Sequence, residues 1–313
     1  MKLTMRFLLP VFGVLLLANA AAAAASWTSD AATCAGTEGT VDERIVACTR
    51  AITSGQLSPE ELAISYYNRG IEWRDKGDYD KAIADYSEAI RRNPQYALAY
   101  NNRGIAWRDK GDYDKAIADY SEAILLNPQY VLAYNNRGIA WRDKGDYDKA
   151  IADYSEAILL NPEYALAYNN RGIARFNKGE FSSAALDLAQ SQQLKPSIYT
   201  AIWLYLARAR NNSDGETELT LNTKDMDGKK WPAPVAALYL GKSDSTTVIS
   251  QSVNPEQKKY KEQLCEANFF LGEWHLLHNE TQQARMLFTK AQNECPKTFS
   301  EYGSAVTELQ RIK

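Results

Sequence analysis

The chain has 313 residues, with 36 Lys and Arg against 39 Asp and Glu, so its formal net charge at pH 7 is −3. Acidic and basic residues alternate along the whole chain and form no basic stripe. This balance gives no reason to propose nucleic acid or an anionic membrane surface as the partner. The length suits one large domain or two ordinary ones.

The first 25 residues have the layout of a secretory signal peptide. Lys2 and Arg6 form a short positive region, residues 7–18 are apolar, and residues 19–25 are almost all Ala. The apolar stretch is about a dozen residues, shorter than the ~20 residues of a membrane-spanning helix. We therefore predict that residues 1–25 are a signal peptide and that the protein is periplasmic or secreted. No Cys comes directly after the apolar stretch, so we expect no lipid anchor, and no other segment is apolar enough for an integral membrane span.

The four cysteines of the chain form an even set, which in an exported protein favours disulfides over metal binding or catalysis. They are Cys34, Cys48, Cys265 and Cys295. Among the three connectivities, the local one pairs Cys34 with Cys48 and Cys265 with Cys295. Residues 26–62 are expected to be a loop tied down by the first pair, followed by a capping helix over residues 42–54.

Residues 63–198 contain four tandem copies of a 34-residue repeat, and residues 97–130 and 131–164 differ at only two positions. The recurring residues predict two antiparallel helices per repeat. Gly70 and its equivalents would let the two helices approach closely, with Ala82 facing them. Gly77 and its equivalents suit the left-handed end of the first helix, and Asp78 and its equivalents suit the N-cap of the second. Pro94 and its equivalents end the second helix.

The rest of the chain predicts an irregular helical insert over residues 199–264, then a fifth repeat over residues 265–298. Within the insert we expect a helix over residues 199–210, a polar loop over 211–230, and short helices over 231–240 and 243–254. Pro255 would begin the approach to the fifth repeat. Cys265 would open the first helix of that repeat and Cys295 would close the second. Residues 299–313 are expected to hold a capping helix that covers the last apolar face.

A 34-residue helix–turn–helix repeat with this pattern resembles the tetratricopeptide repeat (TPR) family. The resemblance implies an all-α fold, a right-handed superhelical α-solenoid that holds peptides or partner domains in a concave groove. The layout is also similar to the NlpI-type periplasmic TPR adaptors, through "WLYLARAR" (203–210), "ALYLG" (237–241) and "EANFFLGEWHL" (266–276). That similarity implies an adaptor that brings peptidoglycan hydrolases and a processing protease together. This chain departs from that family in lacking the lipid-anchor Cys and in carrying two expected disulfides.

The TPR resemblance implies that several first-helix positions face the groove. Counted from the first residue of each repeat, position 6 carries Asn in all four repeats, position 5 carries Asn in the last three, and position 12 carries Arg in the first three. Asn amides can pair with an extended peptide backbone, and Arg can bind carboxylates of a partner. The alternative is that Asn bridges helices and that each Arg is neutralised by the Asp after it. The candidate groove residues are Asn68, Asn101, Asn102, Asn135, Asn136, Asn169, Asn170, Arg74, Arg108 and Arg142.

The carboxylate clamp of chaperone-binding TPR domains needs Lys or Arg at position 2, 5 or 6. Position 2 is here Ile or Leu, and position 6 is always Asn. We therefore expect that clamp to be absent.

The sequence contains no recognisable catalytic set. Its two histidines, His275 and His278, could bind a metal with Glu273 only if a further ligand converged on them, so we interpret both as packing or surface residues. No Ser/His/Asp spacing, phosphate loop or CxxC motif is present. We predict no catalytic, cofactor or metal site, and a non-enzymatic scaffold that binds envelope proteins or extended peptides. The alternatives are an envelope hydrolase that uses Asp225, Asp227 or Glu262, and a self-associating structural envelope protein.

Overall fold

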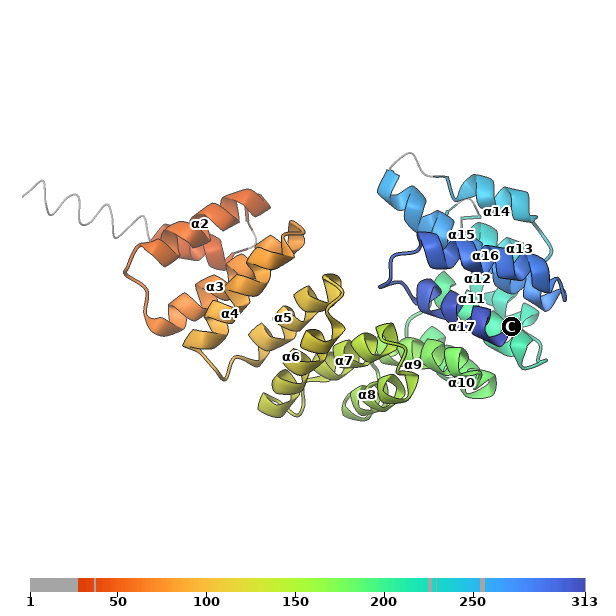
Figure 1. The fold of residues 1–313 in the computed structure, drawn as a ribbon, viewed down its shortest axis with the longest axis horizontal. Coiled ribbons are helices and arrows are strands. Elements are labelled where there is room, and N and C mark those ends of the chain that lie inside the picture. Colours follow the sequence, from red (N-terminus) through yellow and green to blue (C-terminus); the bar gives the residue numbers. More distant parts are fainter. Residues whose placement is uncertain (1–27, 37, 225–226, 229, 254–256, 313) are drawn as a thin grey trace, which may run out of the picture. The chain divides into compact units, whose positions relative to one another are not determined.

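In the computed structural model, the described residues are 28–36, 38–224, 227–228, 230–253 and 257–312. The predicted signal peptide over residues 1–25, the candidate hydrolase residue Asp225 and the expected start at Pro255 of the approach to the fifth repeat lie outside them. Every regular element in the described ranges is a helix, as predicted (Figure 1). None of these helices is both long enough and apolar enough to cross a membrane.

The chain divides into two compact units, residues 1–110 and residues 111–313, which we call the N-terminal unit and the C-terminal unit. The division falls at the turn inside the second repeat rather than between two repeats. The N-terminal unit has helical residues 28–35, followed by α2 (Val41–Thr53), α3 (Pro59–Asp75), α4 (Tyr79–Arg92) and α5 (Ala97–Asp109).

The C-terminal unit continues the tandem repeats and then leaves them. Its repeat helices are α6 (Tyr113–Leu126), α7 (Val131–Asp143), α8 (Tyr147–Leu160), α9 (Ala165–Lys178) and α10 (Phe181–Leu194). The helices that follow are α11 (Ile198–Arg210), α12 (Glu216–Thr223), α13 (Ala233–Tyr239), α14 (Ser245–Gln251), α15 (Gln257–Leu277), α16 (Thr281–Glu294) and α17 (Ser300–Arg311).

The local signals of the repeats act as expected. The Asp78 side chain accepts a hydrogen bond from the backbone N–H of Lys81 and caps α4, and Asp146 caps α8 in the same way. Gly77 has φ 81°, a left-handed conformation that favours glycine. The close approach at Gly70 has a different partner from the one expected. A Cβ there would lie 2.7 Å from the Tyr86 ring, one turn along α4 from Ala82.

A buried ion pair, which the sequence analysis did not recognise, joins the two helices of a repeat. Arg137 Nη2 donates to Asp153 Oδ1 at 2.8 Å, and Arg137 Nη1 donates to Ser121 Oγ of the preceding repeat at 3.0 Å. Arg171 repeats both contacts with Asp187 and Ser155. One guanidinium therefore links its own helix pair to the previous one, and its fork geometry suits the bidentate contact to Asp.

Two details of the C-terminal unit correct the sequence analysis. Residues 216–223 form α12 rather than a loop, because Leu219 is buried in the core and Arg208 pairs with Glu218. Cys265 lies inside α15 rather than at its start, because α15 already begins at Gln257. The disulfides themselves join the predicted partners, Cys34 with Cys48 and Cys265 with Cys295.

An aromatic core holds the C-terminal unit together beyond the repeats. Trp203 of α11 stacks on Phe269 of α15, with ring centroids 5.2 Å apart, and meets Phe176 of α9 edge-on at 5.3 Å. Helix α17, the predicted capping helix, contacts α7, α9, α15 and α16. These contacts bring the end of the chain back onto the last tandem repeats.

Candidate functional site

The predicted groove residues split into buried and half-buried side chains. Asn101, Asn135 and Asn170 are buried, and Asn68, Asn102, Asn136 and Asn169 are half-buried. Position 5 and position 6 therefore do not form one uniformly accessible ladder of amides.

Several of these amides bond to neighbouring first helices. Asn170 Nδ2 donates to Asn135 Oδ1 at 3.0 Å, and Asn102 Nδ2 donates to the Tyr67 hydroxyl at 2.7 Å. Asn169 Oδ1 accepts from the Thr200 hydroxyl at 3.2 Å. These contacts are the helix-bridging role of the alternative interpretation. A role of the amides in binding a partner stays a prediction.

The position-12 arginines contact the Asp that follows each of them. The nitrogen–oxygen distance is 2.9 Å for Arg74 and Asp75, and 2.9 Å for Arg142 and Asp143. Arg108 approaches Asp109 at 3.3 Å. A partner carboxylate would therefore compete with an existing ion pair, and the predicted carboxylate-binding role of these arginines stays a prediction as well.

Apolar side chains recur at position 2 of each tandem repeat, one of the positions where a carboxylate clamp would need Lys or Arg. Position 2 is Ile or Leu in all four aligned repeats, and these side chains are about half exposed. We call them the position-2 row: Ile64 is 47% exposed, Leu98 45%, Leu132 47% and Leu166 47%.

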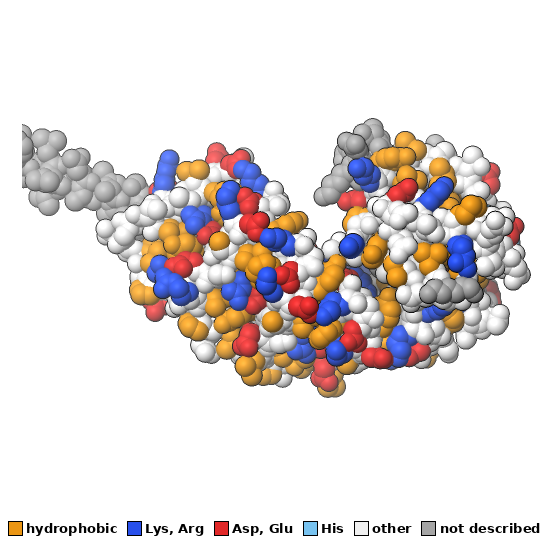
Figure 2. Space-filling model, viewed as in Figure 1, with side chains coloured by type: hydrophobic (Ala, Val, Ile, Leu, Met, Phe, Trp, Pro, Cys, Tyr) orange, Lys and Arg blue, Asp and Glu red, His pale blue; other side chains and the backbone are white. Residues whose placement is uncertain are grey.

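Charged side chains of both signs surround the apolar ones on the surface. Figure 2 shows Lys and Arg interspersed with Asp and Glu on the visible face, with hydrophobic side chains between them. This distribution agrees with the absence of a basic stripe in the sequence.

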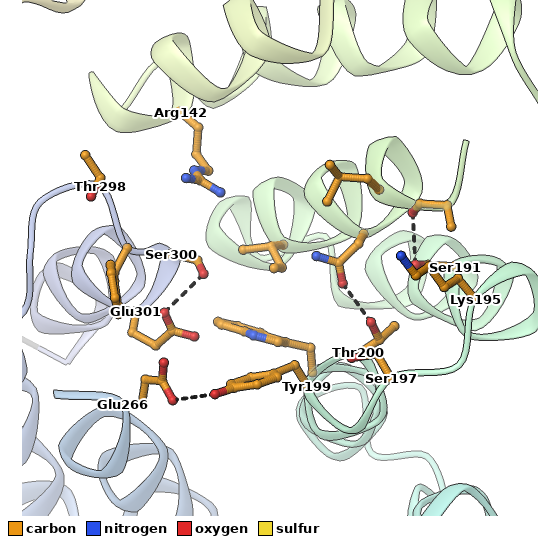
Figure 3. A pocket seen from close by; sticks show the side chains of 16 residues that line it. Arg142, Ser191, Lys195, Ser197, Tyr199, Thr200, Glu266, Thr298, Ser300 and Glu301 are labelled. Atoms are coloured by element: carbon orange, nitrogen blue, oxygen red, sulfur yellow. Dashed lines mark hydrogen bonds between the residues drawn. The ribbon is translucent and has the colours of Figure 1, made fainter. Parts of the chain in front are cut away.

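A cavity of about 480 Å³ lies in the C-terminal unit, where α7 and α9 meet α11, α15 and the start of α17 (Figure 3). We call it the Trp203 cavity. Leu166 and Asn169 line it from α9, so it adjoins the last member of the position-2 row. Tyr199 and Trp203 form part of its wall, and Glu266 and Glu301 approach it from α15 and α17.

The carboxyl groups of Glu266 and Glu301 are buried from water and accept hydrogen bonds from neighbouring side chains. The Tyr199 hydroxyl and the Trp231 indole N–H both donate to Oε2 of Glu266, at 2.9 and 2.6 Å. Burial, and then repulsion from Glu301, raises the pKa of Glu266 to about 7. Burial also raises the pKa of Glu301, whose carboxylate accepts a hydrogen bond from the Ser300 hydroxyl at 3.1 Å.

The histidines lie apart from these acidic groups. His275 Nδ1 contacts Glu280, and His278 Nδ1 contacts the backbone oxygen of Trp274. Glu273, once considered with them as a metal ligand, is fully buried and bonded to Arg210 at 3.0 Å. Within the described ranges, no group of three or more His, Cys, Asp or Glu side chains is placed to hold a metal ion.

Comparison with known proteins identifies the repeats. A family model described as tetratricopeptide repeat matches residues 67–131, and one described as TPR repeat matches residues 140–179. A tetratricopeptide repeat protein from Parabacteroides merdae is similar with a TM-score of 0.54 at 18% identity, covering 79% of this chain and 99% of its own.

Two further solved structures share the fold. The C-terminal part of a TPR repeat-containing protein from Cytophaga hutchinsonii matches with a TM-score of 0.52 at 16% identity, covering 90% of this chain and 97% of its own. A MamA protein matches with a TM-score of 0.50 at 24% identity, covering 54% of this chain and 94% of its own. At these identities the likeness concerns the fold alone.

Proposed function

The chain carries tetratricopeptide repeats, and we propose that it is a non-enzymatic scaffold that binds other proteins through extended segments lying on the first helices of its repeats. The position-2 row is the observation that carries this proposal. A large aliphatic side chain that stays about half exposed loses part of the stabilisation that full burial would give. Because such side chains occur at the same position of four repeats, a partner that covers them would supply the missing burial.

The polar residues beside the row would supply specificity. A backbone in extended conformation presents N–H and C=O groups at regular intervals, and half-buried Asn136 and Asn102 offer amides at the same first-helix face. Asn102 already donates to the Tyr67 hydroxyl and accepts from Arg74 Nη1 at 3.3 Å, so it would bind a partner only through its second N–H and the second lone pair of its oxygen.

We further propose that the partners are envelope proteins. The signal-peptide pattern of residues 1–25 supports export, and two disulfides suit an oxidising compartment. The similarity to NlpI-type adaptors points to peptidoglycan hydrolases and a processing protease among those partners.

A crosslinking experiment in intact cells tests this proposal. The variant Leu132→Asp/Leu166→Asp places two charges in the position-2 row, and we expect it to lose most crosslinked partner proteins. The matched control is Leu186→Asp/Leu221→Asp, because these leucines are 72% and 61% exposed on α10 and α12 and lie at neither surface proposed for binding. Equal recovery of the same partners by both variants would contradict the proposal.

Two exposed leucines on the second helices α6 and α8, Leu125 and Leu159, suggest a second candidate function, self-association. Leu125 and Leu159 occupy the same position of consecutive repeats and are more exposed than the position-2 row. If this surface joins copies of the chain, sedimentation of the wild type will depend on concentration and the Leu125→Asp/Leu159→Asp variant will stay monomeric. A wild type that is monomeric at every concentration removes this candidate.

A further inference from the structure

The Trp203 cavity adjoins the proposed binding surface. Leu166, Asn169 and Ile173, at positions 2, 5 and 9 of the last tandem repeat, all line the cavity. A segment lying on α9 would therefore have one side chain beside the opening. Because the cavity volume of about 480 Å³ falls within the range of small-ligand pockets, it has room for a complete long side chain.

The wall of the cavity is aromatic and held in place. Trp203 is buried and packs against Phe269 and Phe176, whereas Tyr199 is partly exposed and anchored to Glu266 through its hydroxyl. Aromatic rings attract cations that approach their faces, and the attraction grows when water is excluded. The rings do not have to reorganise to offer this wall, since packing already holds them.

The charges around the cavity leave carboxylates in excess. Glu266 and Glu301 approach from two helices, and Glu262 adds a further negative charge near Glu266. Arg142 also lines the cavity; it is paired with Asp143 at 2.9 Å and has a weaker attraction to Glu301. Lys195 also lines the cavity, but its side chain is exposed to solvent. Burial, and then repulsion from Glu301, raises the pKa of Glu266, so a cation placed beside these two carboxyl groups would relieve part of their repulsion.

We propose that the Trp203 cavity binds a lysine or arginine side chain of a partner segment, between the aromatic wall and the carboxylates of Glu266 and Glu301. This inference rests on the proposed function, because it supplies the partner segment. A guanidinium or ammonium group would form charge-assisted hydrogen bonds with the carboxylates and would favour their ionised forms. A partner carboxylate is disfavoured, because it would meet two acidic groups and an arginine that already has its own Asp.

Selection from a random nonapeptide library with the disulfide-bonded protein tests the proposal. We expect the selected peptides to share a Lys or Arg at one position. In the tightest peptide, replacing that residue by norleucine should weaken binding by about tenfold or more, as expected for loss of a desolvated charge pair. With the Glu266→Gln/Glu301→Gln variant, the two peptides should bind with nearly equal affinity.

Glutamine is chosen because its carbonyl oxygen still accepts the hydrogen bonds of Tyr199 and Trp231. The matched control is Glu122→Gln, the same change at an exposed site on α6, and it should keep the wild-type preference. Helix content and melting temperature are measured for each variant. The readout is a ratio between two peptides on one protein, so loss of stability alone does not produce the expected result.

The outcomes separate the two proposals. If the selected peptides share no Lys or Arg, the cation pocket is overturned and the scaffold proposal stands. The same holds if the double variant still binds the Lys or Arg peptide more tightly than its norleucine counterpart. Enrichment of acidic residues or free carboxyl termini, lost in Arg142→Gln, also overturns it in favour of an anion site. If no peptide is selected by any form of the protein, the scaffold proposal fails and the cation pocket fails with it.

Discussion

The tandem repeats and the helices after them arrange buried charge differently. In the repeats, buried carboxylates bond to arginines of their own repeat, as Asp153 does to Arg137 and Asp187 to both Arg171 and Arg175. In the later helices, Glu273 and Glu308 are both buried and share Arg210, at 3.0 and 3.1 Å, and Glu308 also pairs with Arg311. In the Trp203 cavity, Glu266 accepts hydrogen bonds from the neutral groups of Tyr199 and Trp231. Arginine–carboxylate pairs therefore recur where the chain repeats, and a carboxyl group held by neutral donors occurs where the proposed binding chemistry lies.

The largest expected effect is a difference in stability between a tryptophan of the aromatic core, Trp203, and one of the tandem repeats, Trp141. Trp203→Ala should lower the free energy of unfolding by about 3–5 kcal/mol, because it removes a buried ring that packs on Phe269 and Phe176. The matched change Trp141→Ala should cost about 1–2 kcal/mol, since that ring is only half-buried and covered by Lys149. Urea unfolding followed by circular dichroism measures both. Equal losses would show that the two regions do not differ in this way.

The contribution of an Arg–Asp pair in the repeats can be tested by removing first one partner and then both. Arg137→Met should lower the free energy of unfolding by about 2–3 kcal/mol, because it leaves Asp153 buried without its cation. The double change Arg137→Met/Asp153→Leu should recover most of that loss, since it removes both charges together. Urea unfolding of the two variants gives the comparison. A double variant less stable than the single one would mean that the pair itself provides the stability.

The pH dependence of stability should have opposite signs in the two regions. Burial, and then Glu308, raises the pKa of Glu273 from 4.5 to about 8. Between these values the folded chain holds a proton that the unfolded chain releases, so raising the pH favours unfolding. We expect this group to lower the free energy of unfolding by about 1–3 kcal/mol from about pH 5 to pH 9. In the repeats, Lys149 and the helix cap lower the pKa of Asp146, and its smaller contribution is instead lost as the pH falls.

The control for this titration is Glu273→Gln. Urea midpoints of the wild type and the variant at several pH values should diverge, with a flatter profile for the variant on the alkaline side. Parallel profiles would mean that Glu273 ionises in the folded chain without penalty.

The smallest expected effect concerns the helix caps and the surface ion pairs of the repeats. Asp146→Ala should cost about 1 kcal/mol, because Asp146 caps α8 through the backbone N–H of Lys149. Asp148→Ala removes only an exposed ion pair with Lys178 at 2.7 Å and should cost less than about 0.5 kcal/mol. Thermal unfolding of the two variants tests the order, and a larger loss for Asp148→Ala would reverse it.

Local signals in the sequence were enough to predict the helices of the tandem repeats and their ends. Gly77 and Asp78 end one helix and begin the next through their own backbone and side-chain chemistry, so their roles do not depend on distant residues. The loop expected over residues 211–230 was wrong for 216–223, because a tertiary contact at Leu219 stabilises α12 in a polar stretch. The Arg137–Asp153 pair recurs with the repeat and was present in the aligned sequence, although its spacing of 16 residues belongs to no helical face pattern.

The 34-residue self-similarity by itself determined the fold class and predicted the repeat boundaries, because both depend on residues close together in the chain. Nearness in the chain, rather than the repeat, favoured the local disulfide pairing among the three connectivities. The Trp203 cavity was decided by the tertiary structure alone. Arg142, Tyr199, Glu266 and Glu301 belong to four different helices and share no motif or period. They meet because the aromatic core and α17 bring the end of the chain back against α7 and α9. Burial at that meeting place also raises the pKa of both glutamates, a property that no spacing in the sequence encodes.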